Sequence, residues 1–376
     1  MMQKDRMEQV NKWGKRFIIA GGGTGGHIFP AIAIANALRK MSPQSVFLFV
    51  GAEGKMEMEK VPQAGFEIRG LTIAGFNRSS LIKNIGLPVK LIKSFLQVSK
   101  IMKEFKPDAV IGVGGYSSFP VLRYAQSKGI PTFIHEANSF AGKSNMMLAK
   151  KAAIVFTGTE GMEKFFPKDK IVVSGNPVRH TIASNKVSKE EALRYFGLAA
   201  GKKTVLCVGG SLGAKNINEA ISKDIDLFEQ KNLQLIWQTG KPYLEKAKER
   251  SAGKKHIYVN DFITQMEYAY AAADMVISRS GAMAIAELCI VGKPVVFVPY
   301  PFAAEDHQTA NAQNLVNKNA AMMIEDSQAL HKLIPAVIAL SQNVPLQEKL
   351  VYHISQLGIY DADDKVAADI LNYLNQ

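Results

Sequence analysis

The chain has 376 residues, of which 47% are hydrophobic and 21% are charged. This composition is typical of a globular protein with room for two or more domains, and it excludes the disordered, collagen-like and coiled-coil classes. The formal net charge of +13 predicts anionic partners, either nucleic acid, phosphorylated ligands or an anionic membrane surface.

The cysteines and the first residues predict a cytoplasmic protein. Cys207 and Cys289 show no CxxC spacing and no paired framework, which suits a reducing compartment. Residues 1–15 are polar and predict a flexible tail rather than a secretory signal. Because no window offers about 18 uninterrupted apolar residues, we expect a soluble or peripheral protein.

Short β-branched runs alternate with helical stretches along the whole chain. Continuous apolar strands separated by helices are typical of parallel sheets covered on both faces, so the predicted fold class is α/β, doubly wound. The pattern of strand, glycine-rich turn and helix opens twice, at FIIAGGGTGGH and at VLCVGGSLGAKN, which predicts two Rossmann-like domains joined near residues 177–188. The predicted strands are residues 16–20, 46–50, 109–113, 132–134, 204–208, 233–237, 275–278 and 295–298.

Residues 21–26 form a glycine-rich loop before a helix that we expect to begin near Pro30. Glycines let backbone N–H groups approach a phosphate, and a helix N-terminus adds a favourable partial charge. The loop also satisfies G-x-G-x-x-G, and Glu53 follows the next strand as a candidate ribose ligand. An NAD-dependent oxidoreductase therefore remains an alternative.

His27 ends this loop at the mouth of the predicted sheet. An imidazole beside a phosphate-binding turn can take a proton from an acceptor hydroxyl. The alternative is a histidine that caps the helix or bonds to its own loop. Position alone does not separate the two interpretations.

The segment GVGGYSSFP, residues 112–120, is a second glycine turn in the same half, with hydroxyls on Tyr116, Ser117 and Ser118. Ligands of open α/β sheets bind beyond the carboxyl ends of strands. Two glycine turns at adjacent strand ends therefore predict a pocket for a diphosphate, while ordinary turn chemistry is the alternative for this segment alone.

The segment HEANSFAGKSN follows the next strand, so we expect His135, Glu136 and Asn138 on the same rim. Its Gly-Lys-Ser tail resembles part of a P-loop. The required first glycine is replaced by Ala137, which disfavours a Walker-type NTPase.

In the second half, SRSGAMAIAELCIVGKP predicts a helix capped by Ser280 and closed by Gly292. The N–H groups of residues 281–284 are free of acidic neighbours and can face a phosphate. Glu287 lies in the otherwise apolar helix, where a carboxylate needs a partner. That partner is either a ribose diol or a neighbouring lysine or arginine.

The helix start after the next strand supplies Asp306, His307, Gln308 and Asn311. Amides at this rim suit recognition of sugar hydroxyls, while helix capping by Asp306 is the alternative. The triplet at residues 224–226 resembles the D-x-D of metal-dependent sugar transferases. It lies in a polar helical stretch, so we expect no metal site and stabilisation of a departing diphosphate by helix N-termini and hydroxyls.

A helix is predicted between residue 87 and Pro107, packed on the sheet and carrying a solvated lysine face. The segment 76–87 before it mixes Phe, Leu and Ile with Arg78 and Lys83 and could enter an anionic membrane interface. The apolar positions of the helix are Leu91, Phe95, Val98, Met102 and Phe105, and the lysines are Lys93, Lys100 and Lys103.

The ordered set of motifs resembles the MurG family, the peripheral membrane N-acetylglucosaminyltransferases that convert lipid I to lipid II in bacterial cell-wall synthesis. The resemblance covers nearly the whole chain after the N-terminal tail, although the HEQN of the family is HEAN here, so an amide is absent at position 137. The motifs, in order, are GGTGGH, GVGGYSSFP, HEAN, GNPVR, GGSLGA, NDFITQM, RSGA followed by Glu287, and DHQTANA.

The resemblance implies a GT-B fold, with two Rossmann-like domains facing a cleft. Residues 16–178 would form the acceptor- and membrane-side domain, residues 179–355 the UDP-sugar domain, and residues 356–376 a helix returning to the first domain. It implies inversion by a single displacement, in which the C4 hydroxyl of lipid I attacks the anomeric carbon of UDP-N-acetylglucosamine.

The same resemblance implies roles for individual residues. We expect no cofactor, no metal and no nucleic acid, and we expect the anionic inner face of the cytoplasmic membrane as a partner. The candidate bases are His27 and Glu136; the donor ligands are Thr24, Gly25, Gly26, Asn138, Arg179, Ser211, Ile263 through its backbone, Ala282, Met283, Ala284, Ile285, Ala286, Glu287 and Gln308; the acceptor ligands are Gly114, Gly115, Tyr116 and Ser117.

Three other classes remain open. An NAD-dependent oxidoreductase predicts nicotinamide binding and has no use for the motifs of the second half. A nucleic-acid module predicts salt-sensitive binding to oligonucleotides. Related GT-B enzymes that glycosylate other lipids or epimerise UDP-sugars also share the fold.

Overall fold

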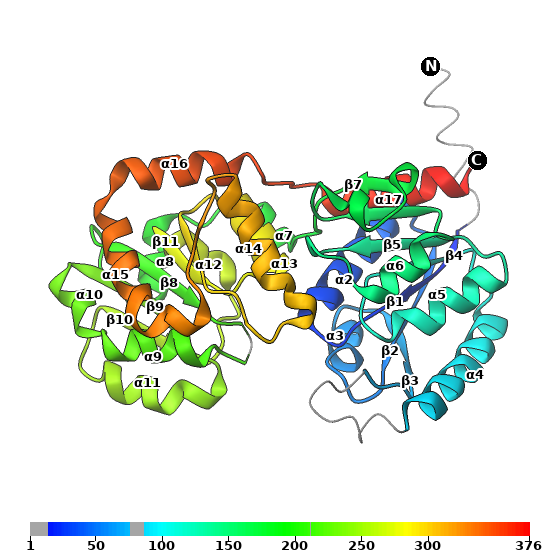
Figure 1. Ribbon diagram of the computed structural model, residues 1–376, viewed down its shortest axis with the longest axis horizontal. Helices are drawn as coiled ribbons and strands as arrows, with labels where there is room; N and C mark the ends of the chain where they lie inside the picture. The colour runs from blue at the N-terminus through cyan, green and yellow to red at the C-terminus, as the bar shows by residue number, and fades with distance from the viewer. Residues whose placement is uncertain (1–13, 76–85, 211) are drawn as a thin grey trace, which may run out of the picture. The chain divides into compact units, whose positions relative to one another are not determined.

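The computed structural model describes residues 14–75, 86–210 and 212–376, and the chain divides into two compact units. Unit 1 contains Met1–Val178 and Asp361–Gln376, and unit 2 contains Arg179–Tyr360 (Figure 1). Each unit has its own parallel sheet and its own buried core.

Unit 1 contains a seven-stranded sheet whose strands all run parallel. The spatial order is β3-β2-β1-β4-β5-β6-β7, so the direction of winding reverses between β1 and β4. The strands are β1 (Arg16–Ala20), β2 (Val46–Ala52), β3 (Glu67–Leu71), β4 (Ala109–Gly112), β5 (Thr132–Glu136), β6 (Ile154–Thr157) and β7 (Ile171–Val173).

Helices cover both faces of this sheet because successive strand residues point to opposite faces. Phe17 and Ile19 belong to one buried cluster, while Ile18 and Ala20 belong to the other. The helices of unit 1 are α2 (Gly25–Met41), α3 (Glu57–Gln63), α4 (Leu87–Phe105), α5 (Ser118–Ser127), α6 (Lys143–Ala149) and α17 (Ala362–Leu374), with short 3-10 turns η2 (Met162–Lys164) and η3 (Lys168–Lys170).

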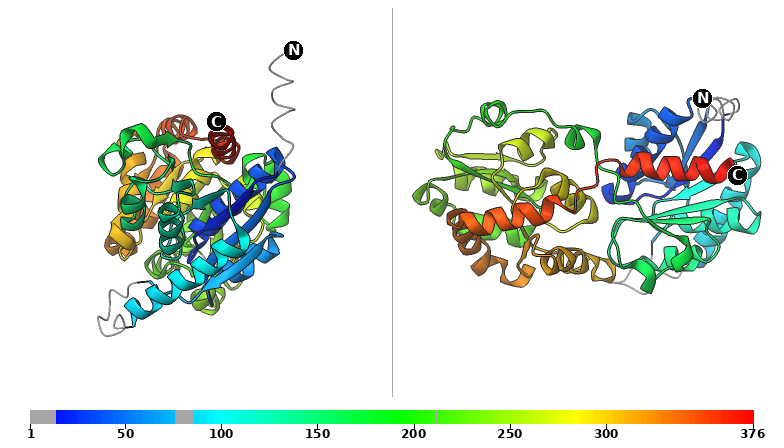
Figure 2. Two further views of the ribbon diagram at one scale, coloured as in Figure 1. Left: turned by 90° about the vertical axis from the view of Figure 1, so that its right-hand side faces the viewer. Right: turned by 90° about the horizontal axis from the view of Figure 1, so that it is seen from above.

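Helix α17 brings the end of the chain back to unit 1, where it packs against α2 (Figure 2). Val366, Ala367 and Ile370 are fully buried in the same cluster as Phe17 and Ile19. The Lys365 ammonium donates to the Val173 carbonyl of β7 at 2.6 Å.

Unit 2 repeats the architecture with six parallel strands in the order β10-β9-β8-β11-β12-β13. Its winding reverses between β8 and β11. The strands are β8 (Lys203–Val208), β9 (Leu233–Gln238), β10 (Ile257–Asn260), β11 (Met275–Ser278), β12 (Val295–Phe297) and β13 (Met322–Met323); the helices are α7 (His180–Ala183), α8 (Lys189–Tyr195), α9 (Lys215–Lys223), α10 (Asp226–Gln230), α11 (Leu244–Ser251), α12 (Met266–Ala272), α13 (Ala282–Val291), α14 (His307–Asn317), α15 (Ala329–Gln342) and α16 (Val344–Ser355).

The predicted α/β, doubly wound fold class is confirmed, and each of the eight predicted strands overlaps an observed one. Among the described residues, five observed strands were not predicted. Two of them are apolar runs, the internal strand β6 (IVFT) and the edge strand β7 (IVV). The other three, β3, β10 and β13, lie at the remaining sheet edges. Their residues are mostly half-buried, so they lack the continuous apolar run that marks a central strand.

Two local predictions about helices were wrong. Helix α2 begins at Gly25, not near Pro30, because Thr24 is extended and the chain turns helical directly after it. Pro30 lies inside the helix and lacks the N–H that would bond to the preceding turn. In α4, Leu91 is 39% exposed, so the predicted apolar stripe is buried only toward the end of the helix.

No helix within residues 14–75, 86–210 and 212–376 combines the length and the apolar content that a bilayer span requires. Residues 1–13 and 76–85 lie outside the described parts of the chain. Residues 1–13 of the predicted tail and residues 76–85 of the predicted membrane-interface segment therefore fall outside them, while Lys15 is bonded to Ser45 and Val46.

We predict that Ile370→Ala destabilises unit 1. The side chain is fully buried between α2 and the sheet, and truncation of a buried isoleucine costs about 2–5 kcal/mol. Urea unfolding followed by circular dichroism measures the effect, and Asn372→Ala, on the exposed face of the same helix, is the control. Equal stability of the two variants would contradict this role for α17.

Candidate active site

The first glycine turn lies at the carboxyl end of β1, where the winding of unit 1 reverses. Gly22 and Gly23 have φ values of +150° and +87°, which residues with a Cβ rarely adopt. The Gly21 N–H donates to the Val50 carbonyl at 3.2 Å, and the Gly23 N–H donates to the Glu57 carboxylate at 2.9 Å. These two amides are therefore used inside the protein and are not available to a phosphate, contrary to the simplest expectation for the loop.

His27 lies in the first turn of α2 and contacts its own loop. Its Nδ1 lies 3.1 Å from the Gly22 carbonyl oxygen and 3.3 Å from the Thr24 hydroxyl. A carbonyl oxygen can only accept, so Nδ1 carries the proton of this bond. In a neutral ring Nε2 is then the basic nitrogen, which is the form a general base needs.

The second glycine turn follows β4, the neighbour of β1 in the sheet, and the two turns touch. A Cβ built at Gly115 would lie 2.5 Å from the Gly22 carbonyl oxygen, and one at Gly114 would lie 2.9 Å from His27 Nε2. Both positions also have positive φ values, +82° and +93°. Glycine is therefore required at Gly114 and Gly115 by backbone conformation and by close approach.

The hydroxyl residues of this second turn differ in accessibility. Burial, with a further contribution from the Glu57 charge, raises the pKa of the Tyr116 phenol. Ser117 is 2% exposed, and the Ser118 hydroxyl donates to the Gly115 carbonyl at 2.8 Å. Tyr116 is half-buried and is thus more accessible than Ser117, the other candidate acceptor ligand that carries a hydroxyl.

Glu136, at the end of β5, anchors the loop that follows it. Its carboxylate accepts four hydrogen bonds, from the Asn138 N–H at 3.1 Å and side chain at 3.2 Å, the Gly142 N–H at 3.0 Å and the Asn145 side chain at 2.9 Å. A carboxylate whose acceptor sites are filled is a poor proton acceptor for a substrate. In the structure Glu136 thus bonds to its own loop and orients Asn138, and its role as the alternative base to His27 stays a prediction.

His135 precedes this loop but lies in the core of unit 1. It is 1% exposed, its Nε2 lies 3.2 Å from the Gly175 carbonyl oxygen, and burial lowers its pKa. The predicted rim therefore contains Asn138, while His135 lies beneath it.

In unit 2, the start of α13 follows β11 at the point where the winding reverses. Gly281 is the N-cap, and the first intrahelical bond runs from the Ile285 N–H to the Gly281 carbonyl at 3.0 Å. The amides of residues 282–284 thus have no intrahelical acceptor, and no acidic residue lies in this turn. The residues that the family resemblance assigns to the donor in this turn differ in burial. Ala282, Met283, Ala284 and Ala286 are half-buried, while Ile285 is buried.

The predicted cap at Ser280 was wrong. The Ser280 hydroxyl donates to the Gln308 carbonyl at 2.8 Å, so it connects α13 to α14 instead. The predicted end of the helix at Gly292 is confirmed by its left-handed conformation, with φ +65°.

Glu287 is 7% exposed and has two partners within unit 2. Arg179 Nε donates to Oε1 at 2.9 Å, and the Tyr270 hydroxyl donates to Oε2 at 3.0 Å. Burial raises the pKa of Glu287, while Arg179 and Tyr270 oppose that rise. Of the two alternatives for a partner, the arginine is present in the structure, so the ribose is not needed to satisfy the carboxylate.

Gln238 and Gln308 organise the rest of this edge. Gln238, 2% exposed, accepts from the Ile263 N–H at 2.9 Å and donates to the Gly210 carbonyl at 3.1 Å. Gln308 accepts from the Tyr300 N–H at 3.0 Å through its side-chain oxygen. Ser211 lies outside the described residues.

The start of α14 departs from the predicted capping by Asp306. Asp306 has φ +52°, and its side chain makes no capping bond to the helix. Its carboxylate accepts instead from the Thr309 hydroxyl at 2.7 Å. Asn311 is 2% exposed and donates to the Ser280 carbonyl at 3.2 Å, so it braces the start of α13.

Four residues of this site were not predicted: Glu57, Asn145, Gln238 and Tyr270. Each contacts a predicted site residue from another element or loop position. The sequence gives no periodic signal for such contacts. Glu57 offers one weak signal, since it lies four residues before the apolar Val61 and therefore on the same face of a helix.

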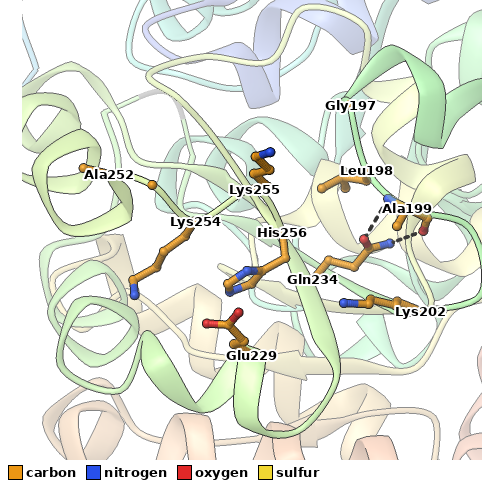
Figure 3. A pocket seen from close by; sticks show the side chains of 11 residues that line it. Gly197, Leu198, Ala199, Lys202, Glu229, Gln234, Ala252, Lys254, Lys255 and His256 are labelled. Atoms are coloured by element: carbon orange, nitrogen blue, oxygen red, sulfur yellow. Dashed lines mark hydrogen bonds between the residues drawn. The ribbon is translucent and has the colours of Figure 1, made fainter.

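A cavity of about 620 Å³ lies elsewhere in unit 2 (Figure 3). Lys202, Lys254, Lys255 and His256 line it together with Glu229. These residues precede β8, β9 and β10, at the amino ends of the strands, whereas ligands of such sheets bind at the carboxyl ends. None of the described site residues lines this cavity.

Within residues 14–75, 86–210 and 212–376, no group of three or more His, Cys, Asp or Glu side chains is placed so that it could hold a metal ion. Asp226 of the D-x-D triplet begins α10 and pairs with Lys254 at 2.6 Å. Glu53, the candidate ribose ligand of a dinucleotide, accepts from the Thr72 hydroxyl at 3.0 Å.

Comparisons with known proteins cover both units. The chain matches the glycosyltransferase family 28 N-terminal domain over residues 17–157 and its C-terminal domain over residues 204–359. It is 49% identical over 358 residues to the UDP-N-acetylglucosamine--N-acetylmuramyl-(pentapeptide) pyrophosphoryl-undecaprenol N-acetylglucosamine transferase of Phocaeicola vulgatus, covering 94% of this chain and 95% of the relative. The protein of the same name from Parabacteroides distasonis is 49% identical over 363 residues, covering 96% and 99%.

A solved structure agrees with these relatives. The crystal structure of Acinetobacter baumannii MurG matches with a TM-score of 0.77 and 30% identity, covering 96% of this chain and 99% of that one. Together with the two sheets, this likeness assigns a GT-B type fold.

We predict that Arg179→Ala destabilises unit 2 in a pH-dependent way. Loss of the cation leaves the buried Glu287 charge with Tyr270 alone, and at neutral pH this should cost about 1–3 kcal/mol. The pKa of Glu287 is already raised by burial and rises further without Arg179. The unfolded state therefore loses the Glu287 proton at a lower pH than the folded state. The loss of unfolding free energy in the variant consequently grows as pH rises and shrinks in acid.

Urea unfolding at about pH 5 and about pH 7 measures this dependence. Adding Glu287→Gln to the Arg179→Ala variant removes the charge and should restore most of the loss at neutral pH. A deficit that is the same at both pH values, or that Glu287→Gln does not reduce, would contradict the pairing.

Proposed function

The chain belongs to the MurG family of glycosyltransferases, and from that premise we propose that it transfers N-acetylglucosamine from UDP-N-acetylglucosamine to the C4 hydroxyl of the muramoyl sugar of lipid I. The product would be lipid II, the precursor of peptidoglycan. The observation that carries the proposal is that the likeness extends along both units at high identity, and not over one nucleotide-binding domain alone.

We assign the donor mainly to unit 2. The amides of residues 282–284 would bind the diphosphate, and the partial positive charge at the start of α13 favours an anion there. Glu287, which accepts from Arg179 and Tyr270 in the structure, would accept from the two hydroxyls of a ribose diol. Its partners would then exchange part of their bonding for the two sugar hydroxyls.

The remaining donor contacts follow the family resemblance. The Ile263 backbone would contact the uracil edge through its carbonyl oxygen, because its N–H already donates to Gln238. Gln308 and Asn138 would bind sugar hydroxyls, and Ser211 the phosphates. Thr24, Gly25 and Gly26, at the start of α2, would lie against the transferred sugar and the diphosphate.

We assign the reaction step to His27. Its Nε2 would take the proton of the acceptor hydroxyl while the oxygen attacks the anomeric carbon, and UDP leaves from the opposite side. One displacement inverts the configuration and needs no covalent sugar intermediate. The negative charge that grows on the leaving diphosphate can be stabilised by the α13 amides, and Gly114, Gly115, Tyr116 and Ser117 would hold the acceptor.

We assign the membrane contact to α4 in unit 1. Val89, Ile92 and Leu96 are 57%, 63% and 67% exposed, although burial of such side chains is normally favourable. Exposed lysines such as Lys90 and Lys93 lie among them. An apolar surface flanked by lysines fits the anionic inner face of the cytoplasmic membrane, where the acceptor lipid would reside.

We predict that His27→Ala lowers turnover by about 10²–10⁴-fold, the range for loss of a general base, while affinity for UDP-N-acetylglucosamine stays near normal. A short-chain lipid I analogue with product analysis measures turnover, and calorimetry measures donor affinity, with UDP-glucose and NAD as competing ligands. His331→Ala, an exposed histidine on α15, is the control.

Two outcomes would decide against parts of this proposal. Near-normal turnover of the His27→Ala variant removes His27 as the base. Failure of the unaltered protein to form the disaccharide lipid, with turnover of another glycolipid acceptor or binding of NAD, rejects the proposed reaction.

We also predict that Ile92→Glu weakens binding to phosphatidylglycerol vesicles by about tenfold or more, because burial of one isoleucine contributes about 1.5–3 kcal/mol. Co-sedimentation measures binding, and Val344→Glu, an exposed apolar position in unit 2, is the matched control. Equal binding of both variants would place the membrane contact elsewhere.

A further inference from the structure

Glu57 is a buried carboxylate to which neither the family resemblance nor the reaction above gives a role. It is 1% exposed and is the first residue of α3. Its Oε1 accepts from the Ala52 N–H at 3.0 Å, and its Oε2 accepts from the Gly23 N–H at 2.9 Å. Both oxygens accept from N–H donors, which is the bonding pattern of an ionised carboxylate.

One peptide group makes hydrogen bonds to both Glu57 and His27. The Gly23 N–H and the Gly22 carbonyl are the two ends of the bond that joins these residues. The Gly22 carbonyl accepts from His27 Nδ1 at 3.1 Å. A continuous chain of hydrogen bonds therefore runs from the Glu57 carboxylate, through this peptide, to the imidazole.

Close packing holds that peptide in place from two sides. A Cβ built at Gly22 would lie 2.3 Å from the Glu57 carboxyl group, and a Cβ at Gly115 would lie 2.5 Å from the Gly22 carbonyl oxygen. The peptide thus lies in a slot between the carboxylate and the second glycine turn. Its orientation is set by these contacts, and with it the direction of the carbonyl that His27 meets.

We propose that Glu57 is a positioning residue for His27, acting through the Gly22–Gly23 peptide. Hydrogen bonds in series polarise one another, so the carboxylate strengthens the carbonyl as an acceptor. That bond fixes the Nδ1–H tautomer, and the negative charge stabilises the imidazolium that forms when Nε2 takes a proton. A carboxylate bonded directly to a catalytic histidine does the same, and here one peptide lies between them.

This inference rests on the proposed role of His27 as the base. Other titratable groups face the same loop. Tyr116 lies beside Gly23 and interacts electrostatically with Glu57, while His135, below the loop on β5, interacts electrostatically with His27. Neither is a carboxylate, so neither replaces the negative charge that the proposal assigns to Glu57.

The test is Glu57→Gln, which keeps the shape and one acceptor oxygen but removes the charge. We expect turnover to fall by about 10–100-fold, the usual cost of losing a group that orients a functional histidine, with unchanged affinity for UDP-N-acetylglucosamine. The acid limb of the kcat/KM profile should move to lower pH, because an imidazolium without the neighbouring anion loses its proton more readily. A purely structural role would lower stability or turnover without moving that limb.

The matched control is Glu59→Gln, an exposed glutamate two residues along the same helix, which should leave the profile unchanged. Glu57→Asp, which keeps the charge, should keep the position of the limb even where shorter reach lowers turnover. Unaltered turnover and an unaltered limb in Glu57→Gln overturn the proposal.

A second measurement does not depend on turnover or on the folding of a variant. Nitrogen NMR of the histidine side chains in the unaltered protein reports which His27 nitrogen is protonated. The proposal requires the Nδ1–H tautomer, and a proton on Nε2 in the neutral ring overturns it. If that tautomer is found but no sugar is transferred to lipid I, the proposed function fails while the hydrogen-bond chain stands.

Discussion

The functional edges of both sheets depend on backbone segments that approach one another more closely than side chains would allow. In unit 1, Gly22 and Gly115 meet where the strand order reverses. In unit 2, a Cβ at Gly213 would lie 2.0 Å from the Thr239 carbonyl oxygen, and one at Gly240 would lie 2.4 Å from the Gly213 nitrogen. The same constraint therefore shapes the loops after β1 and after β8, and it leaves main-chain groups as the main chemistry available at these edges.

Three buried carboxylates lie near these edges, and each accepts from a different set of donors. Glu57 accepts from main-chain amides of β2 and the first turn, and Glu136 accepts from amides within its own loop. Glu287 accepts from Arg179 and Tyr270. Each carboxylate is less than a tenth exposed, and an unpaired charge at such a place is costly. Their hydrogen bonds explain how carboxylates are accommodated beside a hydrophobic core.

The sequence was sufficient to predict the α/β architecture, because the apolar runs that mark central strands are local patterns. Strands 16–20 and 275–278 have the predicted bounds, since central parallel strands are continuous apolar runs. The edge strands β3, β10 and β13 and the start of α2 were not predicted correctly, because mixed burial and glycine conformation leave no periodic pattern. The contacts of Glu57 and Gln238 could not be predicted either, since their partners lie 34 and 25 residues away. The sequence also left the partner of Glu287 undecided, because Arg179 lies 108 residues away.

Main-chain recognition of a nucleotide diphosphate in unit 2 is the claim on which the donor assignment rests. The most direct measurement is a crystal structure of the protein with UDP bound. We predict that the phosphate oxygens lie within hydrogen-bonding distance of the N–H groups of residues 282–284, with the ribose at Glu287. A diphosphate bound at the amino ends of β8 to β10, or at the glycine turn of unit 1 with the α13 amides unoccupied, would contradict it.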